Sequence, residues 1–179
     1  MACITKLANA IAYDCDTGAT GLISAIIINK ADIASFTVDS GVLLVSGLTL
    51  KSGATAFKID TVKRSLVVSS ALKVNDGAPN AFSHSATIVY TGAPNAAWRY
   101  TMNAFTNGSY VIITAPSGTL TRMVYGLYYG LSATSSDMNS HDNGSWNTTV
   151  LSTPENVIGE DTLVMSDTLY QSLYAAALS

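Results

Sequence analysis

Short runs of β-branched and aromatic residues recur along this chain of 179 residues, and turn-forming residues close each run. Such runs favour strands, and Gly, Pro, Asn and Asp between them favour tight turns. The pattern therefore predicts a mainly β fold, which we expect to be a β-sandwich or barrel in a single structural domain, residues 1–179. The predicted strands cover 23–29, 42–50, 55–62, 64–74, 85–90, 110–115, 122–129, 146–151 and 162–165.

The segment 64–74 shows the clearest alternation of apolar and polar positions. A strand with this pattern has one face toward the core and one toward water. A hairpin is predicted where 110–115 and 122–129 flank Pro116-Ser117-Gly118, since Pro and Gly favour a loop of several residues between strands. The predicted inward face of 64–74 carries Leu66, Val68, Leu72 and Val74.

Two segments depart from the strand pattern. Between 95 and 106 the apolar positions Trp98, Met102 and Phe105 share one face of a helix, which Asn107-Gly108 would end. We therefore expect one central helix flanking the strands. A short C-terminal helix capped by Asp167 is also possible, and a strand remains the alternative there.

Residues 131–145 are polar and lack the β-branched and aromatic runs found elsewhere. Long polar segments of this kind are usually surface loops. We expect a mobile loop here unless a neighbouring element orders it.

Charged residues make up only 12% of the chain, about half of the usual share in soluble domains. A surface with so few charges has little electrostatic protection against association, which favours an obligate oligomer. The net charge of −3 argues against a protein that reads nucleic acid, because such proteins cluster Lys and Arg against phosphate.

The charges are unevenly distributed along the chain. All nine basic residues lie at or before Arg122, whereas six acidic residues and no basic ones follow it. Opposed potentials of this kind can fix the register between subunits. Chance in a sparsely charged chain is the alternative. The interface residues predicted on this basis are Asp137, Asp142, Glu155, Glu160 and Asp161.

The sequence offers little material for chemistry, with two His, two Cys and two Glu. His141-Asp142 is adjacent only in sequence, and a base and its orienting carboxylate must meet in space. We expect His84, which lies between serines, to be structural or exposed. Cys3 and Cys15 have no further ligands at zinc-site spacing and should be reduced thiols. We therefore expect no catalytic residues, no cofactor, no metal and no enzymatic activity.

Several short motifs, in order, resemble the tail-tube-like and ring proteins of Bacteroidetes bacteriophages, including the crAss-like phages. The resemblance rests on the opening Met-Ala-Cys-Ile-Thr, a helix with Trp98 and Phe105, the segments 107–112, 125–131 and 146–150, and Gly159-Glu160. It implies a β-sandwich with one flanking helix. It also implies assembly into a six- or twelve-fold ring or tube, in a tail or a portal-proximal collar, through which the genome passes.

The expected partners are other copies of the chain, neighbouring ring, tail or portal proteins, and passing DNA that is not bound sequence-specifically. We expect a virion protein made in the host cytoplasm, since the sequence shows neither a secretory signal nor an apolar run long enough for a membrane anchor. The alternative function is a non-enzymatic binding module, such as a capsid-decoration or adhesin-like β-sandwich. Its aromatic residues Tyr125, Tyr128 and Tyr129 would then contact a ligand.

Overall fold

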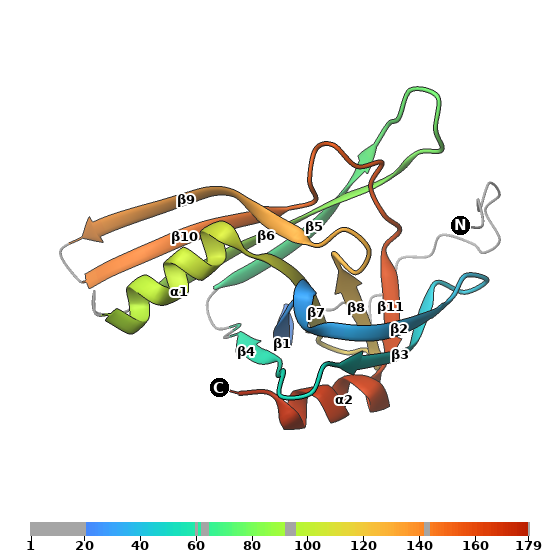
Figure 1. The fold of residues 1–179 in the computed structure, drawn as a ribbon, viewed down its shortest axis with the longest axis horizontal. Helices are drawn as coiled ribbons and strands as arrows, with labels where there is room; N and C mark the ends of the chain where they lie inside the picture. The colour runs from blue at the N-terminus through green and yellow to red at the C-terminus, as the bar shows by residue number, and fades with distance from the viewer. Residues whose placement is uncertain (1–20, 60, 62–64, 92–95, 142–143, 179) are drawn as a thin grey trace.

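The computed structural model describes residues 21–59, 61, 65–91, 96–141 and 144–178. The fold is mainly β with two helices, as the sequence predicts (Figure 1). The described residues form one sheet of eleven strands, in the order β2-β3-β11-β8-β7-β9-β10-β6-β5, with β1 paired to β7 and β4 paired to β1. The strands are β1 (Leu22–Asn29), β2 (Ile33–Asp39), β3 (Leu44–Leu50), β4 (Phe57–Ile59), β5 (Leu66–Lys73), β6 (Ala81–Thr91), β7 (Ser109–Pro116), β8 (Thr121–Tyr125), β9 (Leu131–His141), β10 (Gly144–Ser152) and β11 (Leu163–Ser166).

The central strands β1 and β7 are buried on both faces, because each face supports its own apolar cluster. Ile26 and Ile113 belong to the cluster that β3, β11 and the C-terminal helix cover. Ile27 and Ile112 belong to the opposite cluster, covered by strands β5, β6, β9 and β10. The sandwich-like layering thus comes from one continuous sheet, whose two ends pack on opposite faces of its own centre.

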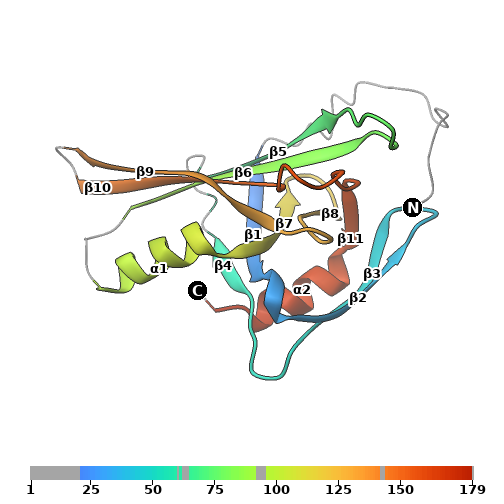
Figure 2. The ribbon, with the colours of Figure 1, turned by 45° about the horizontal axis from the view of Figure 1, so that its top comes forward.

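Both predicted helices are present. Helix α1 (Ala96–Asn107) ends immediately before Gly108, as expected, and lies along β9 (Figure 2). Phe105 is half-buried against the second cluster and contacts Tyr110, at 5.6 Å between ring centroids. The Trp98 side chain, predicted on the same face, lies outside the described part of the structure.

Helix α2 (Asp167–Ala176) packs under β3, β8 and β11 through the buried Tyr170 and the partly buried Leu169 and Leu173. The predicted cap is wrong by one residue: the Ser166 side chain, and not Asp167, accepts the N–H of Leu169 at 3.4 Å. The Asp167 carboxylate instead accepts a hydrogen bond from the Arg122 guanidinium.

The predicted loop 131–145 is also wrong, because most of it is strand. Strands β9 and β10 pair along their whole length and form a hairpin that extends away from the core beside α1 (Figure 1). Hydroxyl groups support this pairing: Ser136 bonds Thr149 at 3.2 Å, and Thr134 donates to the carbonyl of Val150 at 3.2 Å. Ser and Thr side chains can therefore stabilise a hairpin that has few apolar residues.

Candidate functional site

The five acidic residues predicted at an interface have different surroundings. Asp137 is exposed on β9, Glu155 is exposed after β10, and Asp161 is half-buried before β11. Asp142 lies outside the described residues. Glu160 is only 1% exposed, so it cannot contact a partner, and this part of the prediction is wrong.

Glu160 is buried because the loop between β8 and β9 surrounds its carboxylate with backbone N–H groups. One carboxylate oxygen accepts the N–H of Tyr128 at 2.7 Å. The loop turns sharply at Gly126 and Gly130, with φ of 78° and 76°, values that side chains with a Cβ rarely adopt. Burial raises the pKa of Glu160, and the N–H groups of residues 126–129 oppose that rise.

His84 lies on β6 and faces Glu160, with both side chains almost completely excluded from water. Nδ1 is 2.8 Å from the Ser70 hydroxyl across the strand pair, and Nε2 is 3.7 Å from the Glu160 carboxylate. The ring also packs edge-on against Tyr125, 5.3 Å between centroids. Burial lowers the pKa of His84, against a smaller raising effect of Asp161.

Ser70, His84 and Glu160 are the residue types of a nucleophile, a base and an orienting carboxylate. In such a triad the nucleophile hydrogen-bonds one ring nitrogen of the base and the carboxylate hydrogen-bonds the other. Here Nε2 makes no hydrogen bond, at 3.7 Å from the carboxylate. The cluster connects four parts of the fold through polar contacts: β5, β6, the 126–130 loop and the segment before β11.

A second polar contact joins the two oppositely charged parts of the sequence. Arg122 on β8 donates through Nε and Nη2 to one Asp167 oxygen, at 2.9 and 2.7 Å, and its guanidinium lies over the Tyr170 ring. The pKa of Asp167 is lowered, first by this hydrogen bond. One of the acidic residues that follow Arg122 in the sequence is therefore paired with a basic residue of the same chain.

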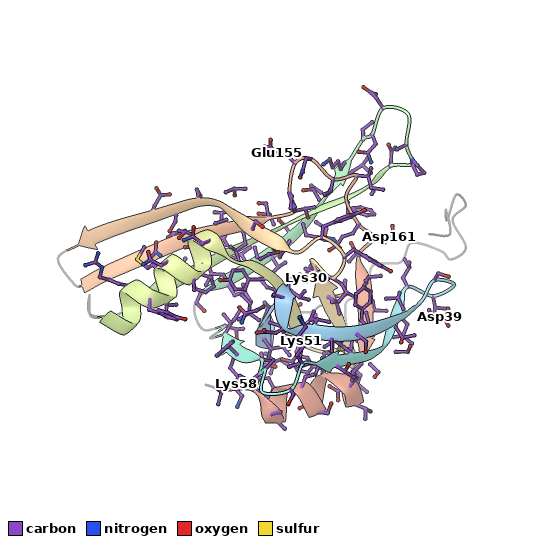
Figure 3. The ribbon with its side chains drawn as sticks, in the orientation of Figure 1. Lys30, Asp39, Lys51, Lys58, Glu155 and Asp161 are labelled. Carbon is purple, nitrogen blue, oxygen red and sulfur yellow. The ribbon has the colours of Figure 1, made fainter. Side chains whose placement is uncertain are left out.

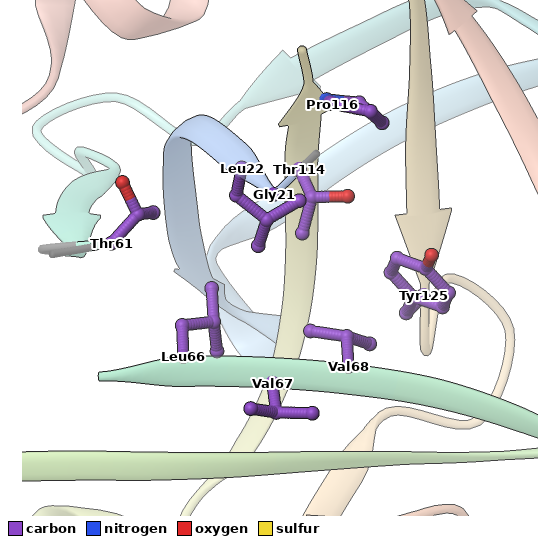
Figure 4. A pocket seen from close by; sticks show the side chains of 9 residues that line it. All are labelled: Gly21, Leu22, Thr61, Leu66, Val67, Val68, Thr114, Pro116 and Tyr125. Carbon is purple, nitrogen blue, oxygen red and sulfur yellow. The ribbon is translucent and has the colours of Figure 1, made fainter. Parts of the chain in front are cut away.

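An open hollow of about 390 Å³ lies between β5 and the β7–β8 pair (Figure 4). Leu66 and Val68 point into it from β5, opposite Thr114 and Tyr125. Burial raises the pKa of the Tyr125 phenol, and its hydrogen bond with Thr114 opposes the rise. No charged side chain lines the hollow.

Within the described residues, no three His, Cys, Asp or Glu side chains gather as a metal site would require. Cys3 and Cys15 lie outside those residues. Neither described helix combines the length and apolar character needed to cross a membrane. Comparisons with protein-family models, with curated proteins and with solved structures found no match.

Sequence reasoning did not find the cluster of Ser70, His84 and Glu160. The three residues are far apart in the chain, and only the pairing of β5 with β6 and the bridge between Phe82 and Glu160 bring them together. The sequence held one signal of this cluster, namely the Gly159-Glu160 pair together with the loop bracketed by Gly126 and Gly130. That this loop binds the Glu160 carboxylate follows only from the tertiary structure.

Proposed function

We propose that this chain is a virion structural protein, a subunit of a homo-oligomeric ring or tube in a phage tail or portal-proximal collar that forms part of the DNA conduit. The proposal assigns it no catalytic step. The observation that supports self-assembly best is strand β5, a long edge strand that the described part of the chain leaves without a partner on one side.

Edge strands of monomeric proteins are usually protected by charges, Pro or β-bulges. Strand β5 has none of these along most of its length: its register with β6 is regular, and Lys73 at its end is its one charged residue. Its side chains Val67 and Leu72 are 49% and 61% exposed, so the prediction that Leu72 lies on an inward face is wrong, as it is for the 69% exposed Val74. The opposite edge strand, β2, has two register irregularities and ends at Asp39. Of the two strands that end the main order of the described sheet, β5 is therefore the better suited to accept another strand.

The register shows which backbone groups of β5 are available. Val89 donates its N–H to the carbonyl of Ser65 at 2.7 Å, in the same register that pairs Leu66 with Ile88. Because hydrogen-bonded pairs alternate in an antiparallel ladder, the N–H and C=O groups of 66, 68, 70 and 72 point away from β6. They can pair with a neighbouring subunit without any change in the fold.

A strand-pairing neighbour can be tested at Leu72. Leu72→Pro removes an outward N–H and no bond to β6, so the monomer should fold normally and assemble poorly. Leu72→Ala is the matched control, because it removes the same exposed side chain and keeps the N–H. We expect light scattering and electron microscopy to show rings or tubes for the wild type and the Ala variant, and smaller species for the Pro variant.

The proposal that the chain forms a ring or tube requires that the wild-type protein assembles. A monodisperse, fully folded monomer at high concentration would contradict the proposal. In purified phage particles, quantitative mass spectrometry should find six or twelve copies of the chain per ring. Hundreds of copies would instead favour a capsid-decoration protein.

The low content of basic residues is compatible with a conduit. A channel that neutralised many phosphates would release counterions and hold the DNA tightly. With nine Lys and Arg against twelve Asp and Glu, the chain offers little of this attraction. DNA should therefore not bind the purified assembly appreciably at physiological salt, which a filter-binding assay would measure.

A further inference from the structure

Two ends of the molecule carry opposite charge. The first, which we call the acidic end, combines the β5–β6 turn with the segment after β10 and consists of Asp76, Glu155, Ile158 and Asp161. The Asn75 side chain joins its two parts by donating to the carbonyl of Ile158 at 2.8 Å. Lys73 also lies there, with its ammonium group donating to the carbonyls of Glu155 and Val157. The acidic end thus carries three carboxylates and one ammonium group.

The second, which we call the basic end, consists of Lys51, Phe57, Lys58 and Leu178. Phe57 and Leu178 form a parallel bridge, and Lys58 lies over the Tyr174 ring, 4.8 Å from its centroid. In Figure 3, Lys51 and Lys58 lie in the lower part of the molecule, away from Glu155 and Asp161 above them. The two ends are therefore separate surfaces.

Within the part of the chain that the structure describes, no ion pair neutralises either end. In the described residues the ion pairs are His84 with Glu160 and Arg122 with Asp167. These account for two of the acidic residues that follow Arg122 and leave Glu155 and Asp161 without a cation within pairing distance. Lys51 and Lys58 likewise have no carboxylate that close in the part of the chain described.

Each end also exposes apolar side chains. Ile158 is 44% exposed, and the adjoining Leu72 is more exposed still. At the basic end, Phe57 and Leu178 are 40% and 57% exposed. Apolar side chains beside unpaired charges are typical of an interface, where burial supplies affinity and complementary charge supplies orientation.

We propose that the acidic end of one subunit docks on the basic end of the next copy of the same chain. This inference rests on the proposed function and names its partner surface. Because the two surfaces differ, the contact is head to tail, and repeated head-to-tail contacts close into a ring when the rotation permits. Like ends repel, which disfavours symmetric dimers that would stop growth.

Charge reversal tests the pairing. The acid-reversed variant is Asp76→Lys/Glu155→Lys, and the lysine-reversed variant is Lys51→Glu/Lys58→Glu. Each variant alone presents like charges at the contact, so assembly at low salt should weaken by about tenfold or more. Mixed together, they restore opposite charges at every contact, so we expect oligomers of alternating subunits in a 1:1 ratio, measured by native mass spectrometry.

The control Asp39→Lys reverses one exposed carboxylate outside both ends and should assemble like the wild type. It is compared with Asp76→Lys alone, which makes the same change in net charge within the acidic end. Circular dichroism and thermal melting establish that every variant is folded. Reversed variants that assemble normally at low salt, or a mixture of folded variants that stays monomeric, would overturn the pairing. If the wild type itself does not assemble, the proposed function fails instead, so the two failures are distinguishable.

Discussion

At the scale of single residues, the least expected feature is Glu160, an acidic residue that the fold places in its interior. Its carboxylate accepts a hydrogen bond from the N–H of Tyr128. The neighbouring His84 ring has a buried Nε2 that makes no hydrogen bond. Buried polar groups of this kind are costly to disturb, because a group left unpaired keeps its full desolvation penalty. The cluster should therefore matter more for stability than any surface charge.

Burial of His84 makes stability depend on pH. Since its folded pKa lies below the ordinary value of 6.5, the neutral ring favours the folded state above about pH 6.5, and this contribution is lost as the pH falls through the folded pKa. The raised pKa of Glu160 has the opposite sign: its contribution is present below 4.5 and lost as the pH rises through the folded value. Lys30, Asp161, Tyr125 and Tyr128 also lie around the pair.

We predict that His84→Gln removes the acid-side loss of stability. Gln can keep the hydrogen bond to Ser70 and does not titrate. Urea unfolding between about pH 8 and about pH 5 should show wild-type stability falling more steeply than that of the variant. A constant difference between the two proteins across this range would show that His84 does not titrate differently on folding.

At the scale of elements, the junction between α1 and β7 depends on one side chain. The hydroxyl of the buried Tyr110 donates to the carbonyl of Ala104, in the last turn of the helix, and its ring contacts Phe105. Gly108 is required between them, because a Cβ there would lie 2.2 Å from the Tyr110 hydroxyl oxygen. The end of α1 is thus held by β7 as well as by its own helical bonds.

We expect Tyr110→Phe to lower the free energy of unfolding by about 0.5–1.5 kcal/mol, the usual net contribution of one hydrogen bond. Tyr100→Phe, on the same helix but 78% exposed, is the control and should have almost no effect. Equilibrium denaturation measures both. Equal stabilities for the two variants would mean that the hydroxyl of Tyr110 does not hold the helix.

At the scale of the whole molecule, the two proposed contacts lie at the same end. The β5 edge adjoins the acidic end through Leu72 and the β5–β6 turn, so one neighbour can use backbone pairing and charge together. Exposed ion pairs contribute only about 0–1 kcal/mol each, so backbone pairing and apolar burial should supply most of the affinity.

Wild-type assembly should accordingly depend on salt without being abolished by it. The screening length falls from about 8 Å at 0.15 M ionic strength to about 3 Å at 1 M, which removes the charge contribution first. Sedimentation velocity across this range should show a weaker but still measurable association at high salt. Complete dissociation at moderate salt would assign the affinity to charge alone and leave the β5 edge without a role.

The sequence by itself determined the class of fold and much of its order. Alternation, β-branched runs and turn residues predicted most strands, the β7–β8 hairpin and both helices, because these signals are local and repeat with the period of the backbone. The strand β9 escaped prediction because its Ser and Thr residues show no apolar face, and pairing with β10 stabilises it.

Only the tertiary structure decided where the charges lie. Glu160 and Asp161 are adjacent in the chain, yet one carboxylate is buried against the 126–130 loop and the other is half-exposed. The surroundings of Asp167 are also set by a distant residue: its carboxylate accepts a hydrogen bond from Arg122, 45 residues earlier in the sequence. None of the three residues lies in a strand, so strand alternation does not set where its side chain points. Whether each carboxylate meets a cation, backbone N–H groups or water depends on which distant element packs against it.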